Sequence, residues 1–138
     1  MSTSNTRSCD ELIVRPRSGK LETFNACKHL DPYLTIQYGG QWIITKVCKK
    51  TEKYPLWTEE FSFKYNEYLQ DLFVECWDYN LSNSQNDSFI GKGILKVKYD
   101  ESTKSLMQWL TLEKGGAIVG EVFFEIDFIV IQSPKSNH

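Results

Sequence analysis

The sequence predicts an all-β fold, an eight-stranded antiparallel β-sandwich, and three observations carry that prediction. Aromatic residues make up 14% of the chain, and they fall in runs where apolar and polar residues alternate, as in half-buried strands. Eight such runs are separated by short turns. No segment shows a convincing helical period. Short strands without helices favour two packed sheets around one core.

The expected strands follow from a two-residue period. The first begins at Glu11–Arg15 and places Leu12 and Val14 on one face. Pro16 cannot donate to a sheet ladder, so we expect this strand to lie at an edge or to be bulged near Pro16 and Ser18-Gly19. The other expected strands are residues 33–38, 41–48, 61–65, 72–77, 89–97, 107–112 and 120–128.

Connections and faces can also be predicted. Gly39-Gly40 separates the second and third runs and indicates a hairpin turn. Residues 99–105 form a polar connection with room for one short helical turn. The last run carries an apolar face made of Val122, Phe124, Ile126 and Phe128. The four tryptophans lie in strand patterns or turns, and we expect all of them to pack inside: Trp42, Trp57, Trp77 and Trp109.

Length and composition fit one domain. The 138 residues provide for one core, which we place at residues 10–131, between a flexible N-terminus (1–9) and a flexible C-terminal tail (132–138). The start of the chain lacks the apolar core of a secretory signal, and no apolar stretch approaches the roughly 20 residues that span a bilayer. Four well-separated cysteines fit reduced thiols in the cytoplasm better than a zinc site or disulfides.

Three motifs in chain order carry a family resemblance. They are Asp31-Pro32-Tyr33 at a strand start, Pro55-Leu56-Trp57-Thr58-Glu59-Glu60-Phe61-Ser62-Phe63, and Trp77-Asp78-Tyr79-Asn80 running on to Phe89-Ile90-Gly91. Together they resemble the C2 domain family, from about Leu12 to Phe128. The resemblance implies a C2-like Greek-key sandwich whose loops at one end can bind calcium and phospholipid head groups. It also implies that the first strand continues to Leu21.

The resemblance further implies a reduced calcium site. Calcium-binding members supply five Asp residues from two loops. Here Asp31, Asp78 and Asp87 match three of them, whereas Asn25 and Asn80 stand at the other two positions. Each Asn removes one negative charge, and ligand charge is a main determinant of calcium affinity. We therefore expect one ion held weakly or not at all. Asp and Asn also stabilise loops by bonding their own backbone, which is the alternative role for these residues.

A lysine cluster at residues 46–53 is the candidate lipid contact, formed by Lys46, Lys49, Lys50 and Lys53. If this segment is a strand, Lys46, Cys48 and Lys50 share one face. The resemblance implies contact of such a patch with anionic lipid, and each lysine then contributes about 1 kcal/mol. The alternative is ordinary protection of an exposed strand by charge. A net charge of −2 argues against nucleic acid as a partner.

Two functions remain open. The first is a cytoplasmic, peripheral membrane module that binds anionic phospholipid with a weak or lost calcium site. The second is a calcium-independent module for protein–protein interaction. Catalysis on a small-molecule substrate is not expected, because His29 is the only internal histidine and no glycine-rich loop is placed to cradle phosphate.

Overall fold

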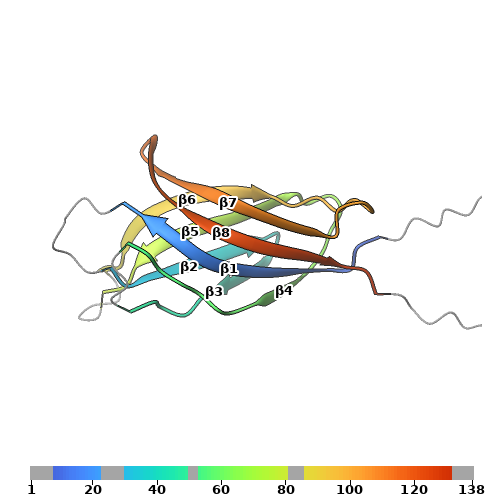
Figure 1. Cartoon of the computed structure of the whole chain (residues 1–138), viewed down its shortest axis with the longest axis horizontal. Helices are drawn as coiled ribbons and strands as arrows, with labels where there is room; N and C mark the ends of the chain where they lie inside the picture. The colour runs from blue at the N-terminus through green and yellow to red at the C-terminus, as the bar shows by residue number, and fades with distance from the viewer. Residues whose placement is uncertain (1–7, 23–29, 50–52, 81–85, 132–138) are drawn as a thin grey trace, which may run out of the picture.

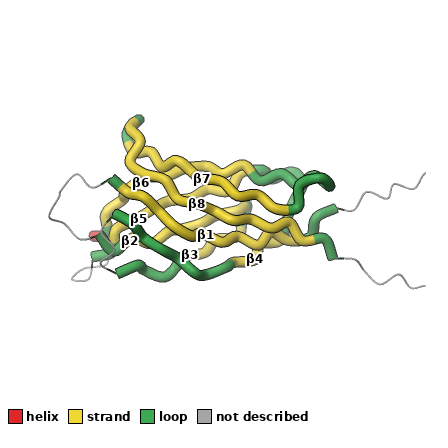
Figure 2. The backbone as a smooth tube through the Cα atoms, in the orientation of Figure 1, coloured by secondary structure: helices red, strands yellow, loops and turns green. Residues whose placement is uncertain are grey.

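The computed structural model describes residues 8–22, 30–49, 53–80 and 86–131. Within them the chain forms strands joined by turns, without an α-helix (Figures 1 and 2). The strands are β1 (Glu11–Leu21), β2 (Pro32–Tyr38), β3 (Gln41–Ile44), β4 (Phe61–Lys64), β5 (Asp71–Asp78), β6 (Ser88–Lys96), β7 (Ser105–Lys114) and β8 (Ala117–Ile129). The predicted set of strands is confirmed.

The strands of this described part pair in the order β3-β2-β5-β6-β7-β8-β1-β4, and each pairing is antiparallel. Two four-stranded layers result, β3-β2-β5-β6 behind β7-β8-β1-β4 in the view of Figure 1. The layers meet where β6 and β7 pair through Lys92 and Glu113. The fold is therefore the predicted antiparallel sandwich, curled towards a barrel.

Alternation of apolar residues builds the core between the layers. In β1, Leu12 and Val14 are fully buried, and in β8 the predicted face of Val122, Phe124, Ile126 and Phe128 is buried as well. The opposing layer contributes buried side chains from β2 and β5: Leu34, Ile36, Tyr38, Leu72, Val74 and Cys76. Full burial of one large aliphatic side chain stabilises by roughly 1.5–3 kcal/mol, so this stripe holds the layers together.

β1 continues to Leu21 and contains the expected irregularity. Its register against β8 shifts between Pro16 and Gly19, where the proline cannot donate to the ladder. β1 is not an edge strand, because it pairs with both β8 and β4. Beyond the bulge, the Gly19 N–H donates to the Pro55 carbonyl at 2.9 Å. The bulge therefore lets the second half of β1 pair with the turn segment around Pro55.

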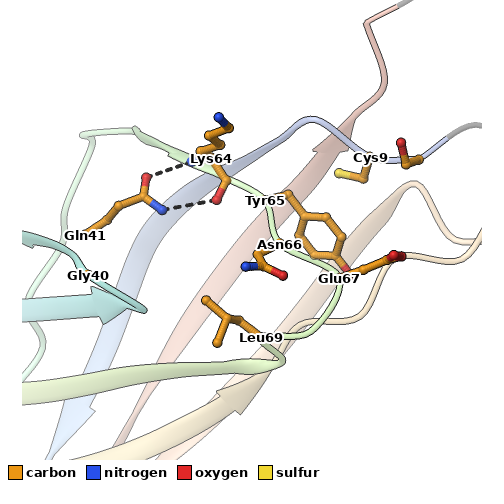
Figure 3. Close-up of a pocket in the computed structure, with 9 residues that line it drawn as sticks. Cys9, Gly40, Gln41, Lys64, Tyr65, Asn66, Glu67 and Leu69 are labelled. Carbon is orange, nitrogen blue, oxygen red and sulfur yellow. Dashed lines mark hydrogen bonds between the residues drawn. The ribbon is translucent and has the colours of Figure 1, made fainter.

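A side chain bridges the two edge strands β3 and β4. The Gln41 amide nitrogen donates to the Lys64 carbonyl at 3.1 Å, and the Lys64 N–H donates to the Gln41 amide oxygen at 2.7 Å (Figure 3). These bonds substitute for a missing ladder between the edges, and they leave less of each edge open to another chain.

Two sequence expectations were wrong. β3 ends at Ile44, because Thr45 turns inward and its hydroxyl accepts from the Leu34 N–H at 2.9 Å. Trp42 and Trp109 are exposed, since each lies on the outward face of its strand. The polar connection before β7, which had room for one helical turn, forms a turn in which Asp100 accepts from the N–H and the hydroxyl of Ser102.

Candidate functional site

One end of the sandwich collects the predicted acidic residues. Pro32, at the start of β2, pairs with Asp78 at the end of β5, and Asp78 pairs with Ser88 at the start of β6. Asp31 and Asp87 directly precede these two strand starts. Described residues of the chain ends lie at the other end, where the Ile131 N–H donates to the Asp10 carboxylate at 2.7 Å (right in Figure 1).

Asp78 holds the segment before β2 in place. Its Oδ1 accepts from the Asp31 N–H at 2.8 Å, and the Tyr79 N–H donates back to the Asp31 carbonyl at 2.9 Å. The Asp78 side chain is almost wholly buried. A buried carboxylate needs such donors, because burying it without hydrogen bonds would cost several kcal/mol. These bonds tie the two distant segments together.

Asp87 has both carboxylate oxygens engaged. Oδ1 accepts from the Asn80 N–H at 2.9 Å, which closes the ends of the loop between β5 and β6. Oδ2 accepts from the Tyr33 hydroxyl at 2.7 Å. Burial raises the pKa of Tyr33 to about 12, with the hydrogen bond to Asp87 adding to the rise. Tyr33 therefore stays protonated and remains a donor to Asp87 across physiological pH.

The described carboxylates Asp78 and Asp87 already have hydrogen-bond partners within the protein. Among the residues that the structure describes, no group of three or more His, Cys, Asp or Glu side chains is placed to hold a metal ion. The oxygens of Asp78 and Asp87 accept instead from backbone N–H groups and Tyr33. Calcium needs six to eight oxygens converging on one point. Asn25 lies outside the described residues.

Lysines lie at the same end as the acidic residues. The Cys48 N–H donates to the Pro32 carbonyl at 2.9 Å, which places Lys49 near the start of β2. Leu21 donates its N–H to the Lys53 carbonyl at 2.7 Å, which places Lys53 at the end of β1. Lys46, Lys49 and Lys53 are all exposed. Lys50 lies outside the described residues.

The lysines do not share a strand face as expected, because β3 ends at Ile44, before Lys46. The segment that follows β3 is held by other bonds. The Lys46 N–H donates to Glu59 Oε1 at 2.8 Å, and the Lys46 carbonyl accepts from the Trp57 indole at 3.2 Å. Both bonds use the backbone of Lys46 and leave its side chain to point outward.

Sequence reasoning missed a hollow of about 670 Å³ beside Lys53. Lys20, Lys53, Tyr54 and Ile118 line it, together with Glu22 and Glu121. Tyr54 and Ile118 are large apolar side chains left mostly exposed. The sequence carries no clear signal for Ile118: β8 begins directly after the Gly115-Gly116 turn, but its first four residues do not alternate, with Ala117 and Ile118 exposed and Val119 and Gly120 buried.

A second hollow, of about 560 Å³, lies at the opposite end beside Cys9, Gln41 and Tyr65 (Figure 3). The Cys9 thiol donates to the Glu11 carbonyl at 3.2 Å. Burial raises the pKa of Cys9, Cys48 and Cys76. A thiol with a raised pKa is a poor nucleophile at neutral pH. These cysteines therefore act as packing residues.

The family model for the C2 domain matches residues 5–112. The chain belongs to the C2 domain family. A C2 and GRAM domain-containing protein of Arabidopsis thaliana is 35% identical over 105 residues, which cover 71% of this chain but 10% of that protein. C2 domains are non-catalytic modules in most proteins. Within the described residues, no helix is long and apolar enough to cross a membrane.

Solved structures share the C2 fold at low identity. A C2 domain-containing protein from a putative elicitor-responsive gene superposes with a TM-score of 0.76 at 19% identity, covering 99% of this chain and all of that one. A calcium-bound structure of the paired C2 domains of extended synaptotagmin 2 gives 0.70 at 19% identity, covering 91% of this chain and 48% of that one. Identities this low establish the fold alone.

Proposed function

We propose that this C2 domain is a peripheral module for anionic phospholipid surfaces and that it binds them mainly by charge. The observation that carries the proposal is the exposure of Lys46, Lys49 and Lys53 at one end of the sandwich. Exposed lysines on a shared end can face a flat anionic surface together. Tyr54 and Ile118 lie beside Lys53 and add apolar surface that can rest among head groups.

Calcium contributes little in this proposal. Asp78 and Asp87 already hold loop backbone and Tyr33, and two Asn residues replace expected carboxylates. The calcium-bound structure of extended synaptotagmin 2 is a C2 structure that does carry the ion. The acidic residues in the present chain serve instead to fix the loops that flank the lysines.

Charge attraction of this size gives reversible attachment. Each lysine near an anionic surface is worth about 1 kcal/mol. The three described lysines, with Lys50 as a predicted fourth, supply about 3–4 kcal/mol, which corresponds to a dissociation constant near the millimolar range. The domain then samples the membrane unless a second contact adds avidity.

Co-sedimentation with liposomes tests the proposal. The domain should sediment with vesicles that contain phosphatidylserine and not with pure phosphatidylcholine vesicles. Binding should fall as the ionic strength rises from about 0.1 M to about 1 M, because the screening length drops from about 10 Å to about 3 Å. It should be equal in calcium and in chelator. Binding to neutral vesicles, or only with calcium, would contradict the proposal.

A calcium-independent protein-interaction function is the second candidate. The outer face of the β3-β2-β5-β6 layer favours it, because large apolar side chains are exposed there, among them Trp42, Phe73 and Ile94. Exposed apolar surface of this kind marks interaction sites on soluble proteins.

A further inference from the structure

The outer face of the β3-β2-β5-β6 layer carries a row of large apolar side chains. Strand register places Trp42 beside Gln37, Gln37 beside Phe73, and Phe73 beside Ile94. Phe73 is 45% exposed, Ile94 50% and Trp42 56%. Phe73 and Ile94 line a hollow of about 930 Å³ together with Trp109 of β7. We call Phe73, Ile94 and Trp109, with Trp42 at the edge, the apolar row.

Charged pairs flank the apolar row on both sides. In the register of β5 and β6, Asp71 stands beside Lys96 on one side of the Phe73–Ile94 pair, and Glu75 stands beside Lys92 on the other. Each pair has its acid on β5 and its base on β6. The face therefore shows a negative strand next to a positive strand, with apolar residues between the charges.

We propose that this face docks against the same face of a second copy of the chain. A two-fold axis parallel to the strands, running between β5 and β6, would place β5 of one copy over β6 of the other. Phe73 would then face Ile94 of the other copy, and Glu75 would face its Lys92. An interface with two-fold symmetry requires such self-complementarity. The register of β5 and β6 supplies this self-complementarity in three successive cross-strand pairs on the same face: Asp71 with Lys96, Phe73 with Ile94, and Glu75 with Lys92.

Charge argues for a second copy and against an anionic bilayer as the occupant. Asp71, Glu75, Lys92 and Lys96 sum to zero, so the face offers an anionic membrane no net attraction. A partner with the same pattern meets opposite charges when it is turned by the two-fold axis. The membrane-facing lysines lie at the end of the sandwich, so the two surfaces are separate.

The expected dimer is weak. Strands are spaced about 4.8 Å apart and side chains on one face recur every ~6.8 Å, so four to five strands and three rows cover a patch of roughly 20 by 20 Å. That is below the ~800 Å² per partner of a standard interface. Two chains should therefore associate reversibly, in the micromolar range or weaker, and aromatic contacts near the centre should dominate the affinity.

A charge exchange between two variants tests the proposal. Glu75→Lys places a new lysine opposite Lys92 of the other copy, and Lys92→Glu places two glutamates opposite each other, so each variant alone should be monomeric. Mixed in equal amounts, the two variants regain opposite charges at both contacts. Sedimentation velocity across a concentration series should show a concentration-dependent dimer for the parent chain and for the mixture. Thermal melting checks that each variant is folded.

Substitutions in the apolar row give an independent test. Ile94→Ser should raise the dimer dissociation constant about tenfold or more, whereas Leu56→Ser, at an exposed position beside Ser18 of β1 and away from the apolar row, should leave it unchanged. A parent chain that stays monomeric throughout the series overturns the proposal, as does a mixture no more dimeric than either variant. If Ile94→Ser instead weakens liposome binding of a monomeric chain, the face contacts membrane and the proposal is wrong.

Discussion

Trp57 joins the turn motif to the core. Only 2% of its surface is exposed, and its indole N–H donates to the Lys46 carbonyl at 3.2 Å. Trp57→Ala should lower the free energy of unfolding by about 3–5 kcal/mol, because it leaves a cavity in the core. Trp42→Ala, at an exposed position, is the control and should cost well under half of that. Denaturant unfolding measures both, and equal losses would show that Trp57 is not packed as described.

Tyr33 makes stability depend on pH at the alkaline side. Its pKa is raised to about 12 in the folded chain, against about 10 in the unfolded chain. Its contribution is therefore complete below pH 10 and is lost as the pH rises towards 12. Tyr33→Phe should be less stable than the parent at pH 7, by about 1–2 kcal/mol, and this difference should shrink above pH 10. A difference that stays constant through pH 12 would contradict the raised pKa of Tyr33.

Gly93 sets the closeness of β6 and β7 where the two layers meet. A Cβ at this position would lie 2.4 Å from the Thr111 carbonyl oxygen, a backbone atom that cannot swing away. Gly93→Ala should destabilise by about 1–3 kcal/mol through this overpacking. Gly40→Ala is the matched control, because nothing lies within 4 Å of its Cβ. Equal unfolding free energies for the two variants would mean that the layers can separate without cost.

At the scale of elements, the sequence predicted strands well because a half-buried strand shows its face through alternation. It did not predict where β3 ends, because the cause is the Thr45 hydroxyl accepting from the Leu34 N–H, a side-chain contact across the β2–β3 hairpin that leaves no mark on the apolar pattern. Trp42 and Trp109 were placed inside because they lie in strand patterns. Whether a strand's other face is covered depends on the packing of the layers, which periodicity does not reveal.

The sequence predicted which residues form the candidate site. It did not predict the hydrogen bonds that these residues make. Asp31, Asp78 and Asp87 were identified from family motifs, and they do meet at one end. The bond from Asp31 N–H to Asp78 spans 47 positions in the chain, and such a contact leaves no local pattern. The structural role of these carboxylates therefore became visible only once β2 and β5 were paired.

At the scale of the whole molecule, the two candidate surfaces lie apart. The lysine end faces along the strands, and the apolar row faces outward from one layer. A dimer with its two-fold axis parallel to the strands would point both lysine ends the same way. Two membrane contacts would then act together, and weak attachment would strengthen by avidity.

The central claim is that lysine charge, and not calcium, drives membrane attachment. The most direct measurement compares three variants in co-sedimentation with phosphatidylserine liposomes in the presence of calcium. The first changes Lys46, Lys49 and Lys53 to Ser. The second makes the same net charge change at exposed lysines elsewhere, Lys64, Lys98 and Lys104. The third is Asp78→Asn, whose amide oxygen can still accept from Asp31.

We predict that the first variant loses sedimentation while the second and third keep most of it. The two lysine variants carry equal net charge. A difference in their binding therefore shows that the position of the lysines matters, and not only the net charge of the domain. If Asp78→Asn abolishes sedimentation and the Lys46, Lys49 and Lys53 variant still binds, calcium coordination drives attachment and the account is wrong.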